Sequence, residues 1–260
     1  IVLDAITSYY SYDNANVHRG VHYLSQEATD KFENTRKSVQ AFVNAKNSCE
    51  IIFTKGATDS INLVANGYRS ILSKGDGVII SEMEHHSNIV PWQMCCEVSG
   101  ATLKVIPILD NGELDMVAFG NLLSEKIKLV ALTHISNALG TINPIEELIA
   151  LTHKVGAKIL IDGAKATPHA LVDVQALDVD FYCFSSHKMY GPTGVGVLYG
   201  KEALLEELPP CQGGGEMIKE VSFEKTTYAD LPHKFEAGTP NIAGVIVFKA
   251  ALDFITNLGI

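Results

Sequence analysis

The sequence predicts an α/β protein in which a mostly parallel sheet is doubly wound, with helices on both of its faces. Short apolar runs rich in β-forming residues alternate along the chain with segments of helical periodicity. The six runs that predict strands are residues 50–53, 77–81, 101–108, 128–134, 157–162 and 179–185. Because alternating strands and helices build parallel sheets that are covered on both sides, this order favours a doubly wound architecture.

The segments around these strands support the same fold. Helical spacing is shown by Ile61, Val64, Ala65, Tyr68, Ile71 and Leu72, and again by Ile145, Leu148, Ile149 and Thr152. A further strand at 194–199 follows its predecessor after a tight turn, so we expect it to run antiparallel. Residues 241–258 predict one long helix, with Val245, Phe248, Ala251 and Ile255 on its apolar face.

Composition limits the kinds of protein this can be. The 260 residues suffice for one substantial core, and 30 acidic against 20 basic residues, without a Lys/Arg cluster, argue against a nucleic-acid partner. The five cysteines form no CxxC pair and no zinc spacing, so we expect a reducing compartment, with Cys95 and Cys96 facing the core. The longest apolar run, at 243–248, is too short to cross a bilayer, and no leader is apparent at the start; we therefore expect a cytoplasmic protein without a membrane partner.

The most informative stretch is Ser-Ser-His-Lys at 185–188, which ends an apolar strand and precedes Gly-Pro-Thr-Gly at 191–194. A lysine in this position is expected near low-dielectric surroundings, which favour its neutral amine and Schiff-base chemistry with a carbonyl. The preceding strand ends in Asp162, at the same sheet edge. Pyridoxal phosphate (PLP) needs such a pair, because its aldehyde takes a lysine and its pyridinium nitrogen takes a carboxylate. Strands also end in Asp or Lys for solubility alone, so the surrounding residues must be weighed.

One of these surroundings is Lys-Gly-Ala-Thr-Asp at 55–59, between a strand and a helix. Helix N-termini at the carboxyl edge of a doubly wound sheet bind phosphate groups. Gly56 lets the backbone approach an anion, and the amide and hydroxyl of Thr58 would face it. The alternative is that Thr58 only caps the helix. No Walker or GxGxxG pattern points to a nucleotide.

Two polar side chains follow other strands at the same edge. Glu84-His85-His86 comes after the strand that ends at Ser81; the spacing does not supply a metal site, whereas a histidine there can stack on a flat cofactor and relay protons. Adjacent histidines also occur in solvated turns. Asn137 follows the strand 128–134, and its amide would donate to a phenolic oxygen or bind a substrate carboxylate.

Four motifs together carry a family resemblance. They are Met-Glu-His-His-Ser-Asn-Ile-Val-Pro-Trp at 83–92, Thr-His-Ile-Ser-Asn at 133–137, Ser-Ser-His-Lys-Met-Tyr-Gly-Pro-Thr-Gly at 185–194 and Phe-Glu-Ala-Gly-Thr-Pro-Asn at 235–241. They resemble those of the group II cysteine desulfurases, which belong with the selenocysteine lyases in the class V aminotransferase family of fold-type I PLP enzymes. The resemblance covers essentially the whole chain and implies that residues 1–260 form the large, PLP-binding domain.

The resemblance also implies roles for single residues. Lys188 is the Schiff-base lysine, Asp162 is the partner of the pyridine nitrogen and His85 stacks on the ring, so Lys188 and His85 are the expected catalytic residues. The remaining cofactor-binding positions are Ala57, Thr58, Asn137, Lys165, Ser185, His187 and Thr239.

Family members are homodimers in which the residue matching Thr239 completes the phosphate site of the neighbouring subunit. Arg19 matches a family position near the mouth of the active site, although a surface ion pair would also explain an arginine there. The family's substrates are L-cysteine and L-selenocysteine, and a protein that accepts sulfur is the further partner.

The chain departs from the family in two places. Where Asp-x-x-Gln is usual, it has Asp162-Gly163-Ala164-Lys165. An ammonium at Lys165 would favour the phenolate of the cofactor and lower the pKa of the protonated imine. The family's sulfur-accepting cysteine and its carboxylate-binding arginine lie after the helix at which this chain stops, and an N-terminal strand is also missing.

We therefore expect a fragment that lacks the C-terminal small domain and is inactive as it stands. It would come from an enzyme that converts L-cysteine to L-alanine and passes sulfur, as an enzyme persulfide, to iron–sulfur cluster assembly. The alternatives are a selenocysteine lyase, which shares most motifs, a class V aminotransferase, and a catalytically idle binding or assembly module.

Overall fold

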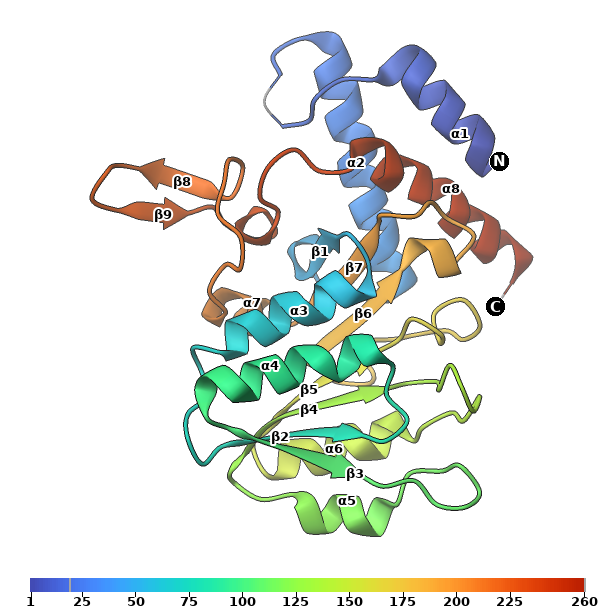
Figure 1. The fold of residues 1–260 in the computed structure, drawn as a ribbon. Coiled ribbons are helices and arrows are strands. Elements are labelled where there is room, and N and C mark those ends of the chain that lie inside the picture. Colours follow the sequence, from blue (N-terminus) through green and yellow to red (C-terminus); the bar gives the residue numbers. More distant parts are fainter. Residues whose placement is uncertain (19, 260) are drawn as a thin grey trace.

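The central feature of the structure, a computed structural model that describes residues 1–18 and 20–259, is one seven-stranded sheet with helices on both faces (Figure 1). The strand order is β1-β7-β6-β5-β4-β2-β3. The strands are β1 (Ile51–Thr54), β2 (Gly77–Ser81), β3 (Thr102–Ile106), β4 (Ile127–Thr133), β5 (Lys158–Asp162), β6 (Phe181–Ser185) and β7 (Gly196–Gly200). The predicted α/β, mostly parallel fold is confirmed.

Six of the seven strands point the same way. The strands β3, β2, β4, β5 and β6 pair in parallel, whereas β7 is antiparallel to both β6 and β1. The expected reversal after the tight turn is therefore correct, and β1 runs in the direction of the parallel strands. As a result, the carboxyl ends of six strands meet at one edge of the sheet.

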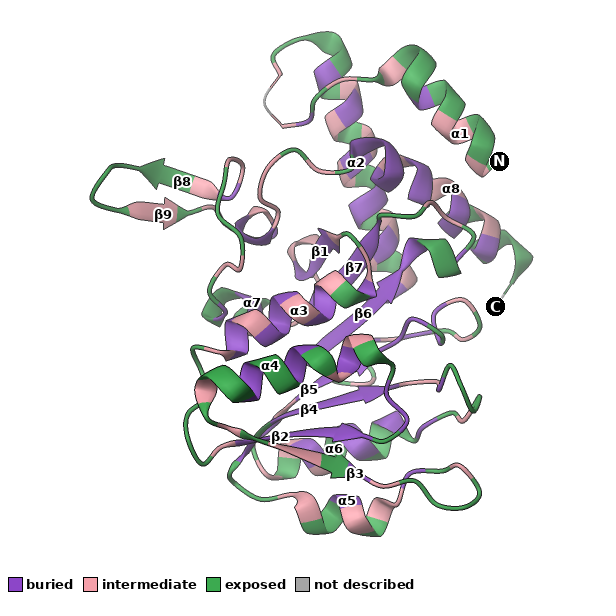
Figure 2. Cartoon of the chain, viewed as in Figure 1, coloured by how far each residue is buried: buried purple, intermediate pink, exposed green. Residues whose placement is uncertain are grey.

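Each face of the sheet has its own hydrophobic core, because successive side chains of a strand point to opposite faces. In β1, Ile51 and Phe53 belong to one core and Ile52 to the other. The first core is covered by α2 (Tyr23–Phe42), α5 (Met116–Leu122), α6 (Ile145–Lys154) and α8 (Ile242–Leu258), and the second by α3 (Ala57–Tyr68), α4 (Val90–Ser99) and α7 (Glu202–Glu207). The strands β2, β6 and β7 are buried along their whole length, and β4 and β5 are buried apart from the lysine near the start of each (Figure 2). Cys95 and Cys96 are buried as predicted.

Several elements are not predicted by the sequence pattern. They are α1 (Val2–Ser8), the π-helical turn Tyr9–Asp13, α2, and the projecting hairpin of β8 (Ile218–Val221) and β9 (Thr226–Tyr228) (Figure 1). The buried face of α2 includes Ser25, Thr35 and Arg36, so an apolar repeat is weak there. The connection from β5 to β6 contains turns and no α-helix. Within the described ranges, no helix is long and apolar enough to span a membrane.

Candidate functional site

The predicted aspartate and lysine lie at the carboxyl edge of adjacent strands. Asp162, the last residue of β5, is paired with Cys183 of β6, and the next amide, that of Gly163, donates to the Cys183 carbonyl at 2.8 Å. The strand β6 ends at Ser185 and leads directly into the 3₁₀ turn Ser186–Lys188. The parallel pairing of β5 and β6 thus brings Asp162 and Lys188 to the same place.

Asp162 is a buried carboxylate with a hydrogen-bond donor at one of its two oxygens. It is 5% exposed, and its Oδ1 accepts a hydrogen bond from the amide of Ala164 at 3.0 Å. Within residues 1–18 and 20–259, no donor binds Oδ2. Burial raises the pKa of Asp162, while the amide of Ala164 and the charges of Lys188 and His85 lower it. The carboxylate therefore has one oxygen available to a cationic partner.

Lys188 is exposed. The expectation that this chain places the amine of Lys188 in low-dielectric surroundings is therefore wrong. The reason is that the turn 186–188 begins at the buried Ser186 but turns its last two residues, His187 and Lys188, to the surface. Its base is fixed, because the Ser186 hydroxyl donates to the Pro192 carbonyl at 2.9 Å. Gly191 permits this close return, since a Cβ there would lie 2.2 Å from the Ser186 Oγ. The backbone is thus held while the amine stays accessible.

The predicted anion site lies where α3 begins. The amide of Ala57 donates to the Ser185 Oγ at 2.8 Å, which joins the start of α3 to the end of β6. Gly56 is the N-cap residue and Thr58 is exposed in the first turn, so the alternative that Thr58 caps this helix is wrong. Gly196 allows the approach of β7, because a Cβ there would lie 2.4 Å from the Gly56 Cα. His187 is exposed next to this region.

His85 and Asn137 line one cavity of about 340 Å³ at the same sheet edge. Both side chains are exposed. The Nδ1 of His85 faces the Ser87 hydroxyl at 2.8 Å and accepts from the Ser87 amide at 3.2 Å, which leaves Nε2 toward solvent. Lys165 is exposed after the turn that follows Asp162 and does not line this cavity. Over the described parts of the chain, no cluster of three metal-ligating side chains occurs.

Motif reasoning misses two polar groups beneath this edge, the half-buried His134 and the buried Glu84. The Nδ1 of His134 lies 2.9 Å from the hydroxyl of Tyr182, and burial lowers the pKa of His134 to about 4. Gly163 is required above Tyr182, since a Cβ would lie 2.0 Å from the ring. Glu84 is 7% exposed, and burial raises its pKa to about 7. Glu84 lies three residues after the end of β2, and the exposed Glu82 is nearer to it, so the sequence pattern does not single out Glu84; His134 carries no signal either.

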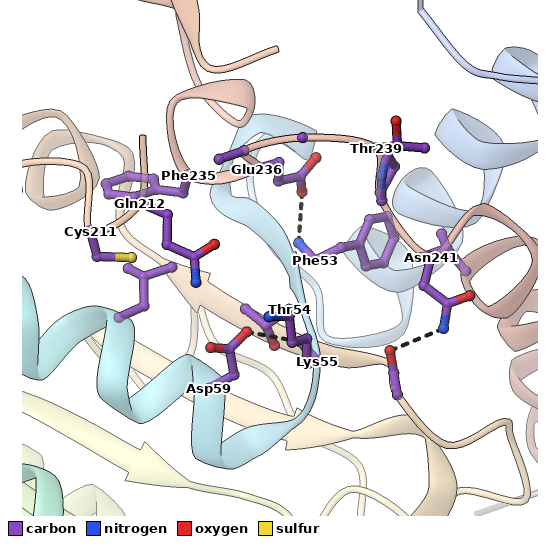
Figure 3. Close-up of a pocket in the computed structure, with 16 residues that line it drawn as sticks. Phe53, Thr54, Lys55, Asp59, Cys211, Gln212, Phe235, Glu236, Thr239 and Asn241 are labelled. Atoms are coloured by element: carbon purple, nitrogen blue, oxygen red, sulfur yellow. Dashed lines mark hydrogen bonds between the residues drawn. The ribbon is translucent and has the colours of Figure 1, made fainter. Parts of the chain in front are cut away.

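Thr239 is exposed and lies near the start of α3. It lines a second cavity of about 170 Å³ together with Lys55, Asp59 and Cys211 (Figure 3). The segment that carries Thr239 is tied to β1, because the amide of Phe53 donates to Glu236 at 2.7 Å. Arg19 lies outside the described residues.

An aspartate and a lysine at the carboxyl edge of a mostly parallel, doubly wound sheet form the arrangement expected of PLP-dependent proteins. Residues 1–260 match the aminotransferase class-V family, and the chain belongs to that family. A cysteine desulfurase of Dickeya dadantii (strain 3937) is 54% identical over 261 residues, which cover 100% of this chain and 63% of the relative. The resemblance to cysteine desulfurases drawn from the motifs is confirmed.

Solved structures agree with this assignment. The apo structure of a cysteine desulfurase from Thermococcus onnurineus NA1 matches with a TM-score of 0.95 and 42% identity, covering 99% of this chain and 64% of that one. A lysine-to-alanine variant of C-DES, which carries glycine covalently linked to its PLP cofactor, matches with a TM-score of 0.86 and 26% identity, covering 99% of this chain and 68% of that one. The chain thus spans 63% of the length of the Dickeya dadantii desulfurase and 64% of that of the Thermococcus onnurineus desulfurase.

Proposed function

We propose that this chain is the cofactor-binding part of a PLP-dependent cysteine desulfurase, which converts L-cysteine to L-alanine and passes the sulfur to an enzyme thiol as a persulfide. The observation that carries the proposal is the meeting of Asp162 and Lys188 at one sheet edge, in a chain 54% identical to a cysteine desulfurase. Resemblance at the motif level supports L-cysteine as substrate, with L-selenocysteine as the alternative.

The residues at this edge suit PLP in charge and in hydrogen-bonding capacity. The free Oδ2 of Asp162 would accept the N–H of the cofactor's ring nitrogen. The Ser185 Oγ already accepts from Ala57, so its own proton is free to donate to a phosphate oxygen. The first turn of α3 adds the amide and hydroxyl of Thr58, and His187 lies next to this region.

When bound, PLP supplies an aldehyde that reacts with amines and an electron sink for the carbanion. The chain contributes proton transfer and orientation. The accessible Nζ of Lys188 would hold the cofactor and then move the α-proton of the substrate, since its turn is fixed and its amine is not. His85, with Nδ1 engaged by Ser87, presents Nε2 as the atom that exchanges protons. Asn137 would orient the substrate or the phenolic oxygen from the same cavity.

The thiol that receives sulfur is proposed to lie in the part of the longer relatives that this chain does not match. Of the five cysteines, Cys95, Cys96 and Cys183 are buried, and Cys49 and Cys211 are partly exposed. Burial raises the pKa of all five, so none is a ready thiolate. The 260-residue chain should therefore transfer little sulfur, and robust persulfide release from it would contradict this assignment.

The complete enzyme is proposed to be a cytoplasmic homodimer in which Thr239 reaches the other subunit's phosphate site, with a sulfur-acceptor protein of iron–sulfur cluster assembly as its partner. Thr239 is exposed, which leaves its side chain accessible to a second subunit and supports this role. We propose that residues 1–260 form the large, PLP-binding domain of that enzyme.

The test is whether PLP becomes attached to Lys188. We expect visible PLP absorbance that survives dialysis, and a peptide containing Lys188 that carries the cofactor after borohydride reduction. Lys188→Ala should lose the adduct completely, while the surface variant Lys154→Ala should retain it. An adduct on another lysine, or a chain that takes up no PLP, would remove the basis of the proposal and leave the idle module as the better explanation.

A further inference from the structure

Glu84 forms the centre of a buried hydrogen-bond network directly before His85. Its Oε1 accepts from the Ser81 hydroxyl at 2.5 Å and from the Thr133 amide at 3.0 Å, and its Oε2 accepts from the Asn88 Nδ2 at 2.6 Å. Each of these partners is at most 7% exposed. One side chain thus joins the end of β2, the end of β4 and the start of the segment that leads into α4.

The directions of these hydrogen bonds are fixed by groups that can only donate. The indole Nε1 of Trp92 donates to the Asn88 Oδ1 at 2.9 Å, which turns the Asn88 Nδ2 toward Glu84. The backbone N–H of Thr133 also can only donate. Both oxygens of Glu84 therefore face an obligatory donor, and Ser81 is the one partner whose hydroxyl can either donate or accept.

This arrangement holds the turn that carries His85 at both ends. Glu84 precedes His85 in the chain, and Asn88 closes the turn through its own amide, which donates to the His85 carbonyl at 2.7 Å. Between them, Ser87 engages the His85 Nδ1. We propose that Glu84 is a positioning residue that fixes the turn 85–88 against β2 and β4 and thereby orients the His85 ring at the cavity; this role in the reaction rests on the proposed function.

The network is suited to hold His85 in either protonation state of Glu84. Burial raises the pKa of Glu84 to about 7, the hydrogen bonds from Ser81, Asn88 and Thr133 lower it, and the charge of Asp162 raises it further. When ionised, Glu84 accepts from Ser81; when neutral, it donates its proton to the Ser81 Oγ and keeps the other two hydrogen bonds. The turn is therefore held on both sides of neutral pH.

The test is a double-mutant cycle on the 260-residue chain, read by the dissociation constant of PLP and by the ¹⁵N shifts of the His85 ring without cofactor. In Glu84→Gln, the new amide meets a donor either way it is turned, the Asn88 Nδ2 or the Thr133 N–H. We expect PLP to bind about tenfold more weakly, and His85 Nδ1 to lose the shift of a hydrogen-bond acceptor. Glu97→Gln, which removes an exposed charge on α4, should change neither.

The double variant Glu84→Gln/Asn88→Asp reverses the central hydrogen bond. The new amide donates to the new carboxylate, which still accepts from Trp92, so every bond is restored. In the double variant, we expect the PLP dissociation constant to return to within about threefold of the wild-type value, and the His85 shifts to return to the wild-type pattern. Asn88→Asp by itself places two carboxylates together, so it should bind PLP most weakly of the set.

Two outcomes would overturn the inference. One is a Glu84→Gln chain with unchanged PLP affinity and unchanged His85 shifts. The other is a double variant that regains thermal stability but not the His85 shifts, because Glu84 would then be structural only; this comparison holds even if Glu84→Gln does not fold. If the wild-type chain binds no PLP, the proposed function fails, while the His85 shifts still decide whether Glu84 orients the ring.

Discussion

Two polar regions of this molecule use their charges in opposite ways. The first is the cluster of Arg36, Glu33 and Glu236, which joins α2 to the segment before Thr239. Arg36 is 1% exposed, and all five of its N–H groups donate: two to Glu236, two to Glu33 and one to the Ile51 carbonyl. Fully matched guanidinium donors are a property of structural ion pairs.

The second region is the carboxyl edge of β5 and β6. Asp162 keeps one oxygen without a donor, and no hydrogen bond or ion pair holds the Lys188 amine, among the residues that the structure describes. Burial of Asp162 raises its pKa, which means that the chain alone destabilises this charge. A buried charge that is destabilised and lacks hydrogen-bond donors is expected to gain its partner from a ligand. In the Arg36 cluster, by contrast, the protein itself supplies an acceptor for every N–H of the guanidinium.

The largest expected effect is a loss of stability when the Arg36 cluster is disrupted. Arg36→Met leaves Glu236 without its cation and Glu33 with His18 as its remaining side-chain partner among the described residues, and we expect the free energy of unfolding to fall by about 3–5 kcal/mol in urea denaturation. Lys37→Met removes the same charge from the exposed face of α2 and should change stability by less than about 0.5 kcal/mol. Equal effects of the two variants would show that the cluster adds no stability.

The second effect separates stability from cofactor binding at the edge. Asp162→Asn removes a buried charge, so the chain without cofactor should be as stable as the wild type or more stable. PLP retention should fall by about tenfold or more, because the ring nitrogen loses its anionic partner. Thermal denaturation and dialysis of the same samples measure both. A loss of stability together with unchanged PLP binding would place Asp162 with the structural charges.

A smaller effect appears in the pH dependence of stability. His134, with its pKa lowered to about 4, is neutral in the folded state, and the unfolded state takes up the proton as pH falls below about 6.5; stability therefore decreases toward acid. Glu84, with its pKa raised to about 7, takes up a proton in the folded state at a higher pH than in the unfolded state, so its contribution to the free energy of unfolding increases toward acid.

The two contributions oppose each other between about pH 4.5 and 6.5. We expect His134→Gln to make the chain relatively more stable at the acid end of this range, and Glu84→Gln to make it relatively less stable there. Urea denaturation at several pH values measures the slopes. Parallel profiles of the wild type and both variants would show that neither group titrates as described.

The smallest effect concerns Lys165. Its ammonium is exposed, so its influence on a bound cofactor is screened by solvent and salt. We expect Lys165→Gln to raise the midpoint of the visible-absorbance pH titration of the PLP-bound chain by a fraction of a pH unit, and the shift should shrink with added salt. Identical titrations of the two proteins would show that Lys165 has no contact with the cofactor's electronics.

Much of the fold was accessible from the sequence because the strands are fully apolar and end in polar residues. All seven strands of the sheet were predicted to within two residues, and so was the long helix at 242–258. The helix α2 was not, since its inward face carries Arg36, which is buried only through partners such as Glu236, two hundred residues away in the chain. Exposure of Lys188 was also mispredicted, because a Gly/Pro-rich turn does not determine what covers it.

What the sequence by itself determined is local: which runs are strands, which turns follow them, and which motifs carry a lysine, an aspartate and a histidine, because side-chain period and turn chemistry are read within a few residues. Only the tertiary structure decided that Glu84, besides its local partners Ser81 and Asn88, also receives a hydrogen bond from Thr133 of β4, and that Oδ2 of Asp162 has no donor among the described residues. Such facts depend on which donors reach a buried oxygen, and strand pairing sets that across distances that no local pattern encodes.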